Sequence, residues 1–325
     1  MATSAPDLTL VVPDLLRDGT TSFPALERLL ARADPIPSAP VIADFDTLLF
    51  QLFGVAIDDP LPIAAVTHAL DSDDCSPGWW LRADPVYLHL QRNHLVLFDQ
   101  GVLRLSHDDA TRLAAEMQED FHLEALYPTR WYLQLSEPAR MQTSSLRVVQ
   151  GQDIRMYLPR GEQGKVWRKR LNDCQIILHN SPVNAEREAR GDPPVNSLWF
   201  WGEGYTPTVP TGIFCQVWSN HPVALGLARL SATQHAPVPR NADNWLANVE
   251  HTGRSHLVVL ENLLSDHLES RNDALTFLEK EWFVPLWQAA RSGKLSSLTL
   301  YPCPALPRRV TGSMLRRRWW PFSHR

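Results

Sequence analysis

The sequence predicts an α/β protein with a mostly parallel sheet, helices on both faces and an inserted α+β domain. The second half of the chain alternates strand and helix patterns, as expected for parallel strands joined by helical crossovers. The strand patterns lie at 212–219, 255–262 and 295–303, and the helical patterns at 222–231 and 271–293. In contrast, residues 81–105 and 130–159 contain short, closely spaced strand patterns, which are typical of antiparallel hairpins.

Residues 1–76 are expected to form the first part of the α/β core. The apolar run Leu8–Leu16, LTLVVPDLL, predicts a buried strand that has Asp14 near its C-terminal end. Apolar residues then recur at helical spacing in three segments, 23–34, 46–55 and 61–71.

Residues 77–205 are expected to form the inserted α+β domain and the segment that returns to the core. Strands are predicted in 81–105, 130–136, 145–150, 154–159 and 197–204. One helix is predicted over 106–121, where Ser106 can cap the first turn and acidic residues suit the helix dipole. A second helix is predicted from Lys165 to about His179, and it carries the basic run Arg168, Lys169 and Arg170.

Residues 206–312 are expected to complete the core, and 313–325 form a basic, aromatic tail. The hydrophobic content of 44% and charged content of 21% are typical of a globular protein. Residues 1–74 contain 12 Asp and Glu against 3 Lys and Arg, whereas residues 282–325 contain 8 Lys and Arg and no acid. The tail is expected to be a solvated terminus, with contact to an anionic surface or a protein partner as the alternative.

The four cysteines are widely spread, and the absence of a CxxC pair argues against a zinc site. They predict reduced thiols in a cytoplasmic protein. No signal peptide is expected, and no apolar run reaches the roughly 18 residues that a membrane span needs. No phosphate-binding glycine loop follows a strand, so neither a nucleotide nor a nucleic acid is a predicted partner.

The most specific motif is the segment His179–Gly204, HNSPVNAEREARGDPPVNSLWFWGEG. With the order of the elements, and with Arg82 and Asp84 on an earlier predicted strand, it resembles the cofactor-independent phosphoglycerate mutases of the archaeal type. That family lies within the alkaline phosphatase superfamily, so the resemblance implies an alkaline-phosphatase-like core. The chain is also similar to a degenerate bacterial subgroup typified by regulatory protein E of a pathogenicity-factor cluster.

The resemblance implies phosphoryl transfer through a Ser or Thr nucleophile between two divalent metals. Mn²⁺ or Mg²⁺ would be the cation in a functional site, held by carboxylates and imidazoles. The candidate metal ligands that the resemblance indicates are Asp14, Asp266 and His267, and the candidate nucleophiles beside the family's threonine position are Thr20, Thr21 and Ser22.

The last predicted strand, LTLYPCPAL, departs from this pattern. The family's late Asp-His pair should end it, but Tyr301, Pro302 and Cys303 stand there, and His324 is the only later acid or imidazole. We therefore expect an eroded two-metal site without a metal cofactor. The expected function is non-catalytic and regulatory, through a phosphorylated metabolite or a protein partner. The alternatives are an active metal-dependent mutase or phosphatase, and an interaction protein that acts through its basic tail.

An anion pocket is expected between the core and the inserted domain. In the mutases, arginines of this domain grip the substrate, and the planar guanidinium suits phosphate and carboxylate groups. The resemblance points to Arg82 and Arg187 as the retained arginines, with Asn184 and Asn196 beside them; solvated surface arginines are the alternative. We also expect the two asparagines to fix the return turn through hydrogen bonds to the backbone.

Overall fold

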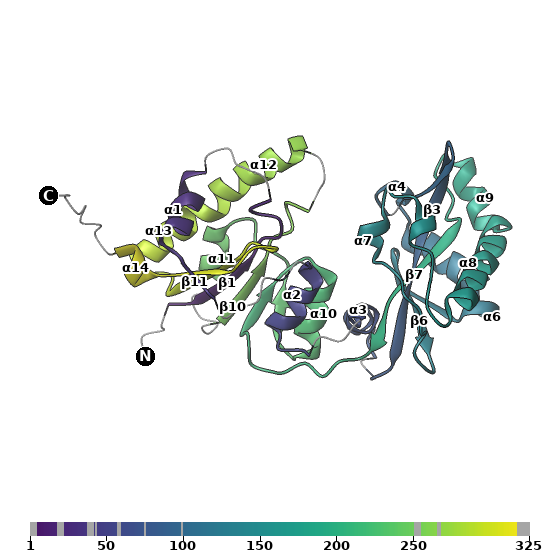
Figure 1. Cartoon of the computed structure of the whole chain (residues 1–325), viewed down its shortest axis with the longest axis horizontal. Coiled ribbons are helices and arrows are strands. Elements are labelled where there is room, and N and C mark those ends of the chain that lie inside the picture. The colour runs from purple at the N-terminus through teal and green to yellow at the C-terminus, as the bar shows by residue number, and fades with distance from the viewer. Residues whose placement is uncertain are drawn as a thin grey trace. The chain divides into compact units, whose positions relative to one another are not determined.

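The computed structural model describes most of the chain, in two compact units that we treat separately (Figure 1). The described residues are 5–17, 23–37, 42, 44–56, 60–74, 76–98, 100–249, 255–264 and 268–316. Residues 1–57 and 208–325 form the core unit, and residues 58–207 form the inserted unit.

The core unit is built on a seven-stranded sheet of order β2-β12-β11-β1-β10-β8-β9. Strand β1 runs parallel to both neighbours, so that Leu10 is level with Val258 on one side and Leu300 on the other. Only β12 and β2 at one edge are antiparallel within this sheet. The strands are β1 (Asp7–Val11), β2 (Asp34–Pro35), β8 (Gln216–Trp218), β9 (Gln234–Ala236), β10 (Ser255–Val259), β11 (Ser297–Tyr301) and β12 (Arg308–Thr311).

Helices flank both faces of the core sheet, with α1, α12 and α13 along one side and α2 and α10 along the other (Figure 1). Leu8 and Leu10 of β1 pack in one apolar cluster with Leu26 and Trp282, which are buried side chains of the first side. The core helices are α1 (Pro24–Arg32), α2 (Phe45–Leu52), α10 (Pro222–Leu230), α11 (Ala242–Val249), α12 (Leu268–Leu278), a π-helical turn (Glu279–Phe283), α13 (Val284–Ser292) and α14 (Gly312–Arg316). The predicted α/β class is confirmed.

The inserted unit contains a five-stranded antiparallel sheet around the long strand β3. Strand β3 pairs with β6 along its first residues, with β4 along its last residues and with β7 on its other side. The strands are β3 (Trp79–Gln91), β4 (His94–Phe98), β5 (Leu123–Tyr127), β6 (Arg130–Leu135) and β7 (Ser197–Tyr205). The helices are α3 (Ile63–Asp71), α4 (Gln100–Leu103), α5 (His107–Glu116), α6 (Gln118–Phe121), α7 (Leu146–Val149), a 3₁₀ turn (Ile154–Met156), α8 (Gly164–His179) and α9 (Pro182–Ala189).

Alternation along β3 divides the inserted unit into two layers. Leu81 and Ala83 pack in the large apolar cluster with residues of α5, α8 and α9. Trp80 points to the opposite face, where it packs with Ala64 and Ala65 of α3. Because successive side chains of a strand point to opposite faces, Arg82 shares the face of Trp80.

The Gly-Glu-Gly end of the sequence motif lets β7 approach α3 closely. A Cβ atom added to Gly204 would lie 2.5 Å from Cβ of Pro62, just before α3. Gly202 has φ +67°, a backbone conformation that other residues rarely adopt. A Cβ atom on it would also lie 3.0 Å from Cβ of Ile63, so both the backbone and the close contact disfavour a side chain there. The two glycines therefore permit the contact between β7 and α3.

Two predicted strands and one expected boundary differ from the structure. Residues 145–150 and 154–159 contain the helix α7 and a 3₁₀ turn, because Leu146 and Val149 are buried at helical spacing and Asp153 caps the turn by accepting from Arg155 N. The insertion was expected to begin at residue 77. The structural division falls at residue 58, because α3 packs on β3 and β7.

The described part of the tail is helical, since α14 covers Gly312–Arg316; residues 317–325 lie outside the described residues. Among the described helices, none combines the length and the apolar character that crossing a membrane requires.

Candidate functional site

The carboxyl ends of the parallel strands are where α/β sheets of this kind bind ligands. In the core unit, Asp14 follows β1, His221 follows β8 and Glu261 follows β10. Tyr301 is the last residue of β11. These ends are hydrogen-bonded to one another through the backbone, since Val12 N donates to Tyr301 O and Leu260 N donates to Val11 O, each at 2.9 Å.

Asp14 lies at the end of β1, where the sequence places it. Its φ of 60° is in the left-handed region, which Asp tolerates better than most residues. Its backbone amide donates to the carbonyl of Cys303 at 2.7 Å, and its carbonyl accepts from the guanidinium of Arg271 at 2.6 Å. Its carboxylate lies 3.7 Å from the guanidinium of Arg17. The backbone of Asp14 therefore joins β1 to the residues after β11.

The end of β11 is occupied by a phenol, a proline ring and a thiol. Burial raises the pKa of Tyr301, so its hydroxyl is a neutral group near pH 7. The buried thiol of Cys303 donates to the carbonyl of Ile42 at 3.2 Å. A hard cation finds no carboxylate or imidazole among Tyr301, Pro302 and Cys303.

His221 lies close to two carboxylates at the carboxyl edge of the core sheet. Its Nε2 lies 3.5 Å from Oε1 of Glu261 and 3.7 Å from Oδ1 of Asp46, in the first turn of α2. Its ring packs edge-on against Phe45, with 4.9 Å between ring centroids. The sequence indicates that His221 begins a helix, but it does not indicate that Asp46 lies near His221. Asp46 stands 175 residues earlier in the chain, and the two meet only in the fold.

A polar hollow of about 280 Å³ opens beside this cluster. Its walls come from the loops after β8, β9 and β10 and from the helical segment α12 to α13. The charged and amide side chains among them are Asn220, Arg240, Glu261 and Asn262, and Phe277 and Trp282 form an apolar wall. Its lining thus holds one guanidinium, of Arg240, and one carboxylate, of Glu261.

The start of α1 is capped by a carboxylate from far along the chain. Phe23 at the N-cap position has no capping side chain, and Glu279 supplies the missing acceptors. Its Oε1 accepts from Ala25 N at 2.6 Å and its Oε2 accepts from Leu26 N at 3.1 Å. Free amides at a helix start form a natural anion site. In this protein the chain's own carboxylate occupies it.

Arg82 of the inserted unit is buried against an acid. Its Nε lies 2.8 Å from Oδ1 of Asp84, and its guanidinium lies between the rings of Tyr132 and Trp201, at 5.4 and 5.3 Å from their centroids. Burial raises the pKa of Asp84, while the charge of Arg82 and the indole N–H of Trp201, which donates to Oδ2 at 2.7 Å, favour the carboxylate. Arg82 is therefore already neutralised by a carboxylate of its own strand.

Arg187 is fully buried on α9, and its guanidinium is committed to internal partners. It donates to Oδ2 of Asp109 at 2.8 Å, to the carbonyl of Leu103 at 2.6 Å and to the carbonyl of Pro193 at 3.0 Å. The structure does not bring Arg82 and Arg187 together. Arg187 lies among the helices that pack against Leu81 and Ala83, whereas Arg82 lies on the other face of the sheet.

The two asparagines fix the return segment to the sheet. The amide of Asn184 donates to the carbonyls of Leu178 and Val195, at 2.8 and 2.7 Å, and its oxygen accepts from Val195 N at 2.9 Å. The amide of Asn196 bonds both backbone groups of Leu88, at 2.7 and 2.8 Å. These bonds confirm the expectation that the asparagines pin the turn.

The other candidate residues lie outside the described residues. They are the candidate nucleophiles Thr20, Thr21 and Ser22 and the candidate metal ligands Asp266 and His267. Within the described residues, no group of three or more His, Cys, Asp or Glu side chains is arranged to hold a metal ion. At the described ends of β1 and β11, Asp14 is a carboxylate of the kind that binds a hard cation, whereas Tyr301, Pro302 and Cys303 supply neither a carboxylate nor an imidazole.

Comparison with known proteins places the chain near one enzyme family, although no family model matches it. It is 28% identical over 155 residues to the 2,3-bisphosphoglycerate-independent phosphoglycerate mutase of Methanosarcina mazei, a match that covers 46% of this chain and 37% of that protein. A mutase of the same name from Methanosarcina acetivorans is 28% identical over 149 residues, covering 42% of this chain and 37% of the relative. The chain thus matches well under half the length of these curated relatives.

One solved structure shares the fold of this chain. A protein from Pyrococcus horikoshii superposes with a TM-score of 0.58 at 13% identity, covering 95% of this chain and 88% of that one. The cofactor-independent phosphoglycerate mutase of Thermoplasma acidophilum has a TM-score of 0.49 at 19% identity, with 94% and 90% of the two chains covered. The first similarity shows the shared fold.

Proposed function

We propose, from its distant homology to the cofactor-independent phosphoglycerate mutases, that this chain is a phosphoglycerate-mutase-like protein that does not catalyse phosphoryl transfer. Its role would be regulatory, through a phosphorylated metabolite or a protein partner. The observation that carries the proposal is the end of β11, where Tyr301, Pro302 and Cys303 stand in place of an acid and an imidazole.

The loss of metal ligands at this point has a direct chemical consequence. Two-metal phosphoryl transfer stabilises the attacking and the leaving oxygen at once, and each metal needs its own carboxylates and imidazoles. A phenol with a raised pKa and a buried thiol engaged with a carbonyl are poor ligands for Mn²⁺ or Mg²⁺. One metal would therefore be held too weakly to take part.

Two further contacts support the proposal. Glu279 fills the amides at the start of α1 with a negative charge, so a substrate phosphate would be repelled there. In the inserted unit, Arg82 and Arg187 already carry carboxylate partners. The groups that would grip a charged substrate are thus engaged within the chain.

A phosphorylated metabolite would bind best in the polar hollow after β8, β9 and β10. Arg240 supplies a cation there, and Asn220 and Asn262 supply amide groups that can donate to phosphate oxygens. We expect a panel of phosphorylated metabolites to include one that raises the melting temperature of the protein. Arg240→Ala should abolish that shift. Arg187→Ala, which changes a residue outside the hollow, should leave the shift unchanged.

The decisive experiment measures turnover. The purified chain is incubated with 3-phosphoglycerate and Mn²⁺, and 2-phosphoglycerate formation is followed beside the Methanosarcina mazei mutase. We expect no conversion above the uncatalysed rate and no tight Mn²⁺ binding by calorimetry. Metal-dependent conversion would overturn the proposal and establish the active mutase instead.

A further inference from the structure

Helix α8 of the inserted unit carries two side-chain stripes at helical spacing. The first is buried and packs in the apolar core of the unit; it consists of Trp167, Leu171, Cys174 and Leu178. The second stripe lines a surface hollow and consists of Val166, Lys169, Arg170, Asp173, Ile176 and Ile177. Of these, Ile177 is partly buried against the core. Only the first stripe is required to hold the helix in place.

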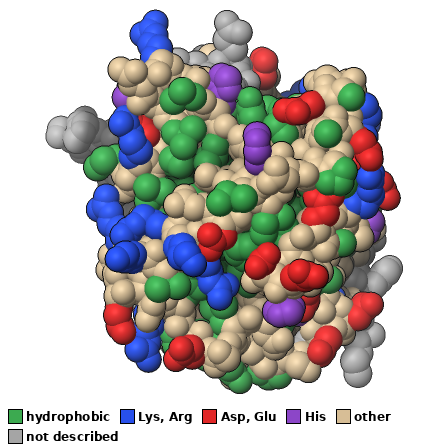
Figure 2. Space-filling view, turned by 90° about the vertical axis from the view of Figure 1, so that its right-hand side faces the viewer, with side chains coloured by type: hydrophobic (Ala, Val, Ile, Leu, Met, Phe, Trp, Pro, Cys, Tyr) green, Lys and Arg blue, Asp and Glu red, His purple; other side chains and the backbone are tan. Residues whose placement is uncertain are grey.

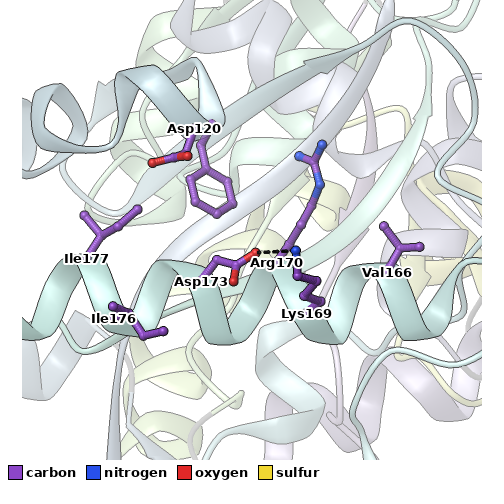
Figure 3. A pocket seen from close by; sticks show the side chains of 8 residues that line it. Asp120, Val166, Lys169, Arg170, Asp173, Ile176 and Ile177 are labelled. Carbon is purple, nitrogen blue, oxygen red and sulfur yellow. Dashed lines mark ion pairs between the residues drawn. The ribbon is translucent and has the colours of Figure 1, made fainter.

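The second stripe forms the floor of a surface groove. A hollow of about 470 Å³ lies between this stripe and Asp120 and Phe121 at the end of α6 (Figure 3). A second hollow of about 220 Å³ lies between α8 and the loop 135–140. The two hollows share Val166 and Arg170, so they adjoin. We call them together the α8 groove.

The larger hollow exposes an aliphatic side chain from each end of the α8 segment that lines it. Val166 is 50% exposed and Ile176 is 63% exposed. They are ten residues apart, which corresponds to about 15 Å along a helix. The face over α8 and α9 shows apolar side chains gathered in its middle, between a side richer in Lys and Arg and a side richer in Asp and Glu (Figure 2). Clustered exposed apolar side chains of this kind mark interaction sites.

Arg170, which borders both hollows, is oriented for binding. Its guanidinium lies over the ring of Trp167, 5.1 Å from the centroid, and this stacking restrains the exposed side chain. Among the described residues no carboxylate forms an ion pair with it. Its neighbour Lys169 is 80% exposed and reaches Asp173 only at 3.9 Å. Two cations are therefore available at the middle of the groove.

The position of these cations along α8 also favours an incoming acid. The first half of the helix carries Lys165, Arg168, Lys169 and Arg170, and its first turn contains no acidic residue. Like charges three or four positions apart on a helix repel one another, as Lys165 does Arg168 and Lys169. Carboxylates of a partner would offset this repulsion.

We propose that the α8 groove binds an acidic protein segment with two aliphatic side chains that flank an Asp or Glu residue. An extended segment rises about 3.3 Å per residue and its alternate side chains share one face, so aliphatic residues four positions apart lie on one face about 13 Å apart, close to the separation of Val166 and Ile176. Their side chains would contact Val166 and Ile176, and the acidic residue midway between them would meet Lys169 and Arg170. The inference rests on the proposed regulatory role, because it names the class of partner.

The chemistry of the groove favours a protein over other anions. Single-stranded nucleic acids commonly stack their bases on exposed aromatic rings, and the two rings here, Trp167 and Phe121, are both buried. Asp120 and Asp173 also line the groove and would repel a continuous phosphate chain or an anionic membrane surface. A peptide with isolated carboxylates avoids both obstacles.

The test measures binding of a designed probe to the full chain. A fluorescein-labelled peptide with the core Leu-Ser-Glu-Ser-Leu between Gly-Ser flanks is titrated by fluorescence anisotropy. Two control peptides replace the glutamate by lysine or the leucines by alanines. We expect saturable binding of the first peptide, weakened by salt, and at least about tenfold weaker binding of each control.

Matched variants locate the site. Arg170→Glu and Ile176→Asp should each weaken binding about tenfold or more. Arg92→Glu at the β3–β4 turn and Val148→Asp on α7 change equally exposed side chains outside the groove and should leave binding unchanged. Melting temperatures show whether each variant is folded; if either groove variant is not, Arg170→Ala and Ile176→Ser replace them.

The inference is overturned if the lysine peptide binds as well, if the groove variants bind like the unmodified chain, or if the peptide does not bind. It is also overturned if single-stranded DNA or anionic vesicles bind to the groove in place of the peptide. Peptide binding is independent of turnover. Mutase activity would therefore overturn the proposed function alone, and absent peptide binding would overturn this inference alone.

Discussion

Helices α8 and α9 follow one another in the inserted unit, and both carry arginines, yet they use them in opposite ways. Arg187 of α9 is fully buried and bonded to a carboxylate and two carbonyls. Arg170 of α8 is exposed, stacked on a tryptophan ring, and has no carboxylate partner among the described residues. The difference teaches that a guanidinium stabilises the fold where its donors are engaged and can recognise a ligand where they are not.

The largest expected effect comes from breaking the engaged arginine. Arg187→Ala should lower the free energy of unfolding by about 3–5 kcal/mol, because it leaves Asp109 buried with one cation fewer and two carbonyls without their donor. Urea unfolding measures this. Arg190→Ala is the matched control: it removes the other cation on Asp109, but its side chain is 47% exposed, so we expect a loss below about 1 kcal/mol. Equal losses would contradict the comparison.

A smaller effect is expected where the core unit uses an acid to cap α1. Glu279→Ala should lower the free energy of unfolding by about 1 kcal/mol, because the amides of Ala25 and Leu26 lose their acceptors. Glu279→Gln keeps one acceptor oxygen and should cost less. Thermal unfolding shows which of the two variants is less stable. Glu188→Gln on the exposed face of α9 is the control and should leave stability unchanged. If Glu279→Ala is as stable as the unmodified chain, the cap does not contribute to the free energy of unfolding.

The smallest effect depends on pH and concerns Glu203 at the end of β7. Burial raises its pKa, and the backbone amides of Ala139 and Arg140 oppose the shift only in part. Between the ordinary and the raised pKa the folded state holds a proton that the unfolded state has lost, so stability falls as pH rises through that interval.

Glu203→Gln removes this titration. We expect the variant to gain stability relative to the unmodified chain as pH rises from about 4.5 to about 8, measured by urea unfolding at several pH values. Within the described residues its Oε2 has no hydrogen-bond partner, so the amide replaces no existing bond. A difference that stays constant with pH would show that Glu203 is not protonated in the folded state.

Much of the fold follows from the sequence. The alternation of strand and helix patterns in the second half predicts the parallel strands β8, β10 and β11, and the structure has them. The short strands β9 and β12 carry too few apolar residues to be recognised. The eight-residue helix α11 is not predicted either, although five of its residues are apolar. The sequence predicts strands at 145–150 and 154–159, where the structure has helical turns, because these apolar runs are too short to separate the two periods.

The sequence by itself determined the chemistry that is present or missing. Tyr301, Pro302 and Cys303 at the end of the last parallel strand, and the basic run on α8, are visible in the letters alone. Only the tertiary structure decided which of these groups are available. The pairing of Arg187 with Asp109 spans 78 residues and that of Glu279 with Ala25 spans 254. Such contacts depend on how helices pack, and no local pattern encodes them.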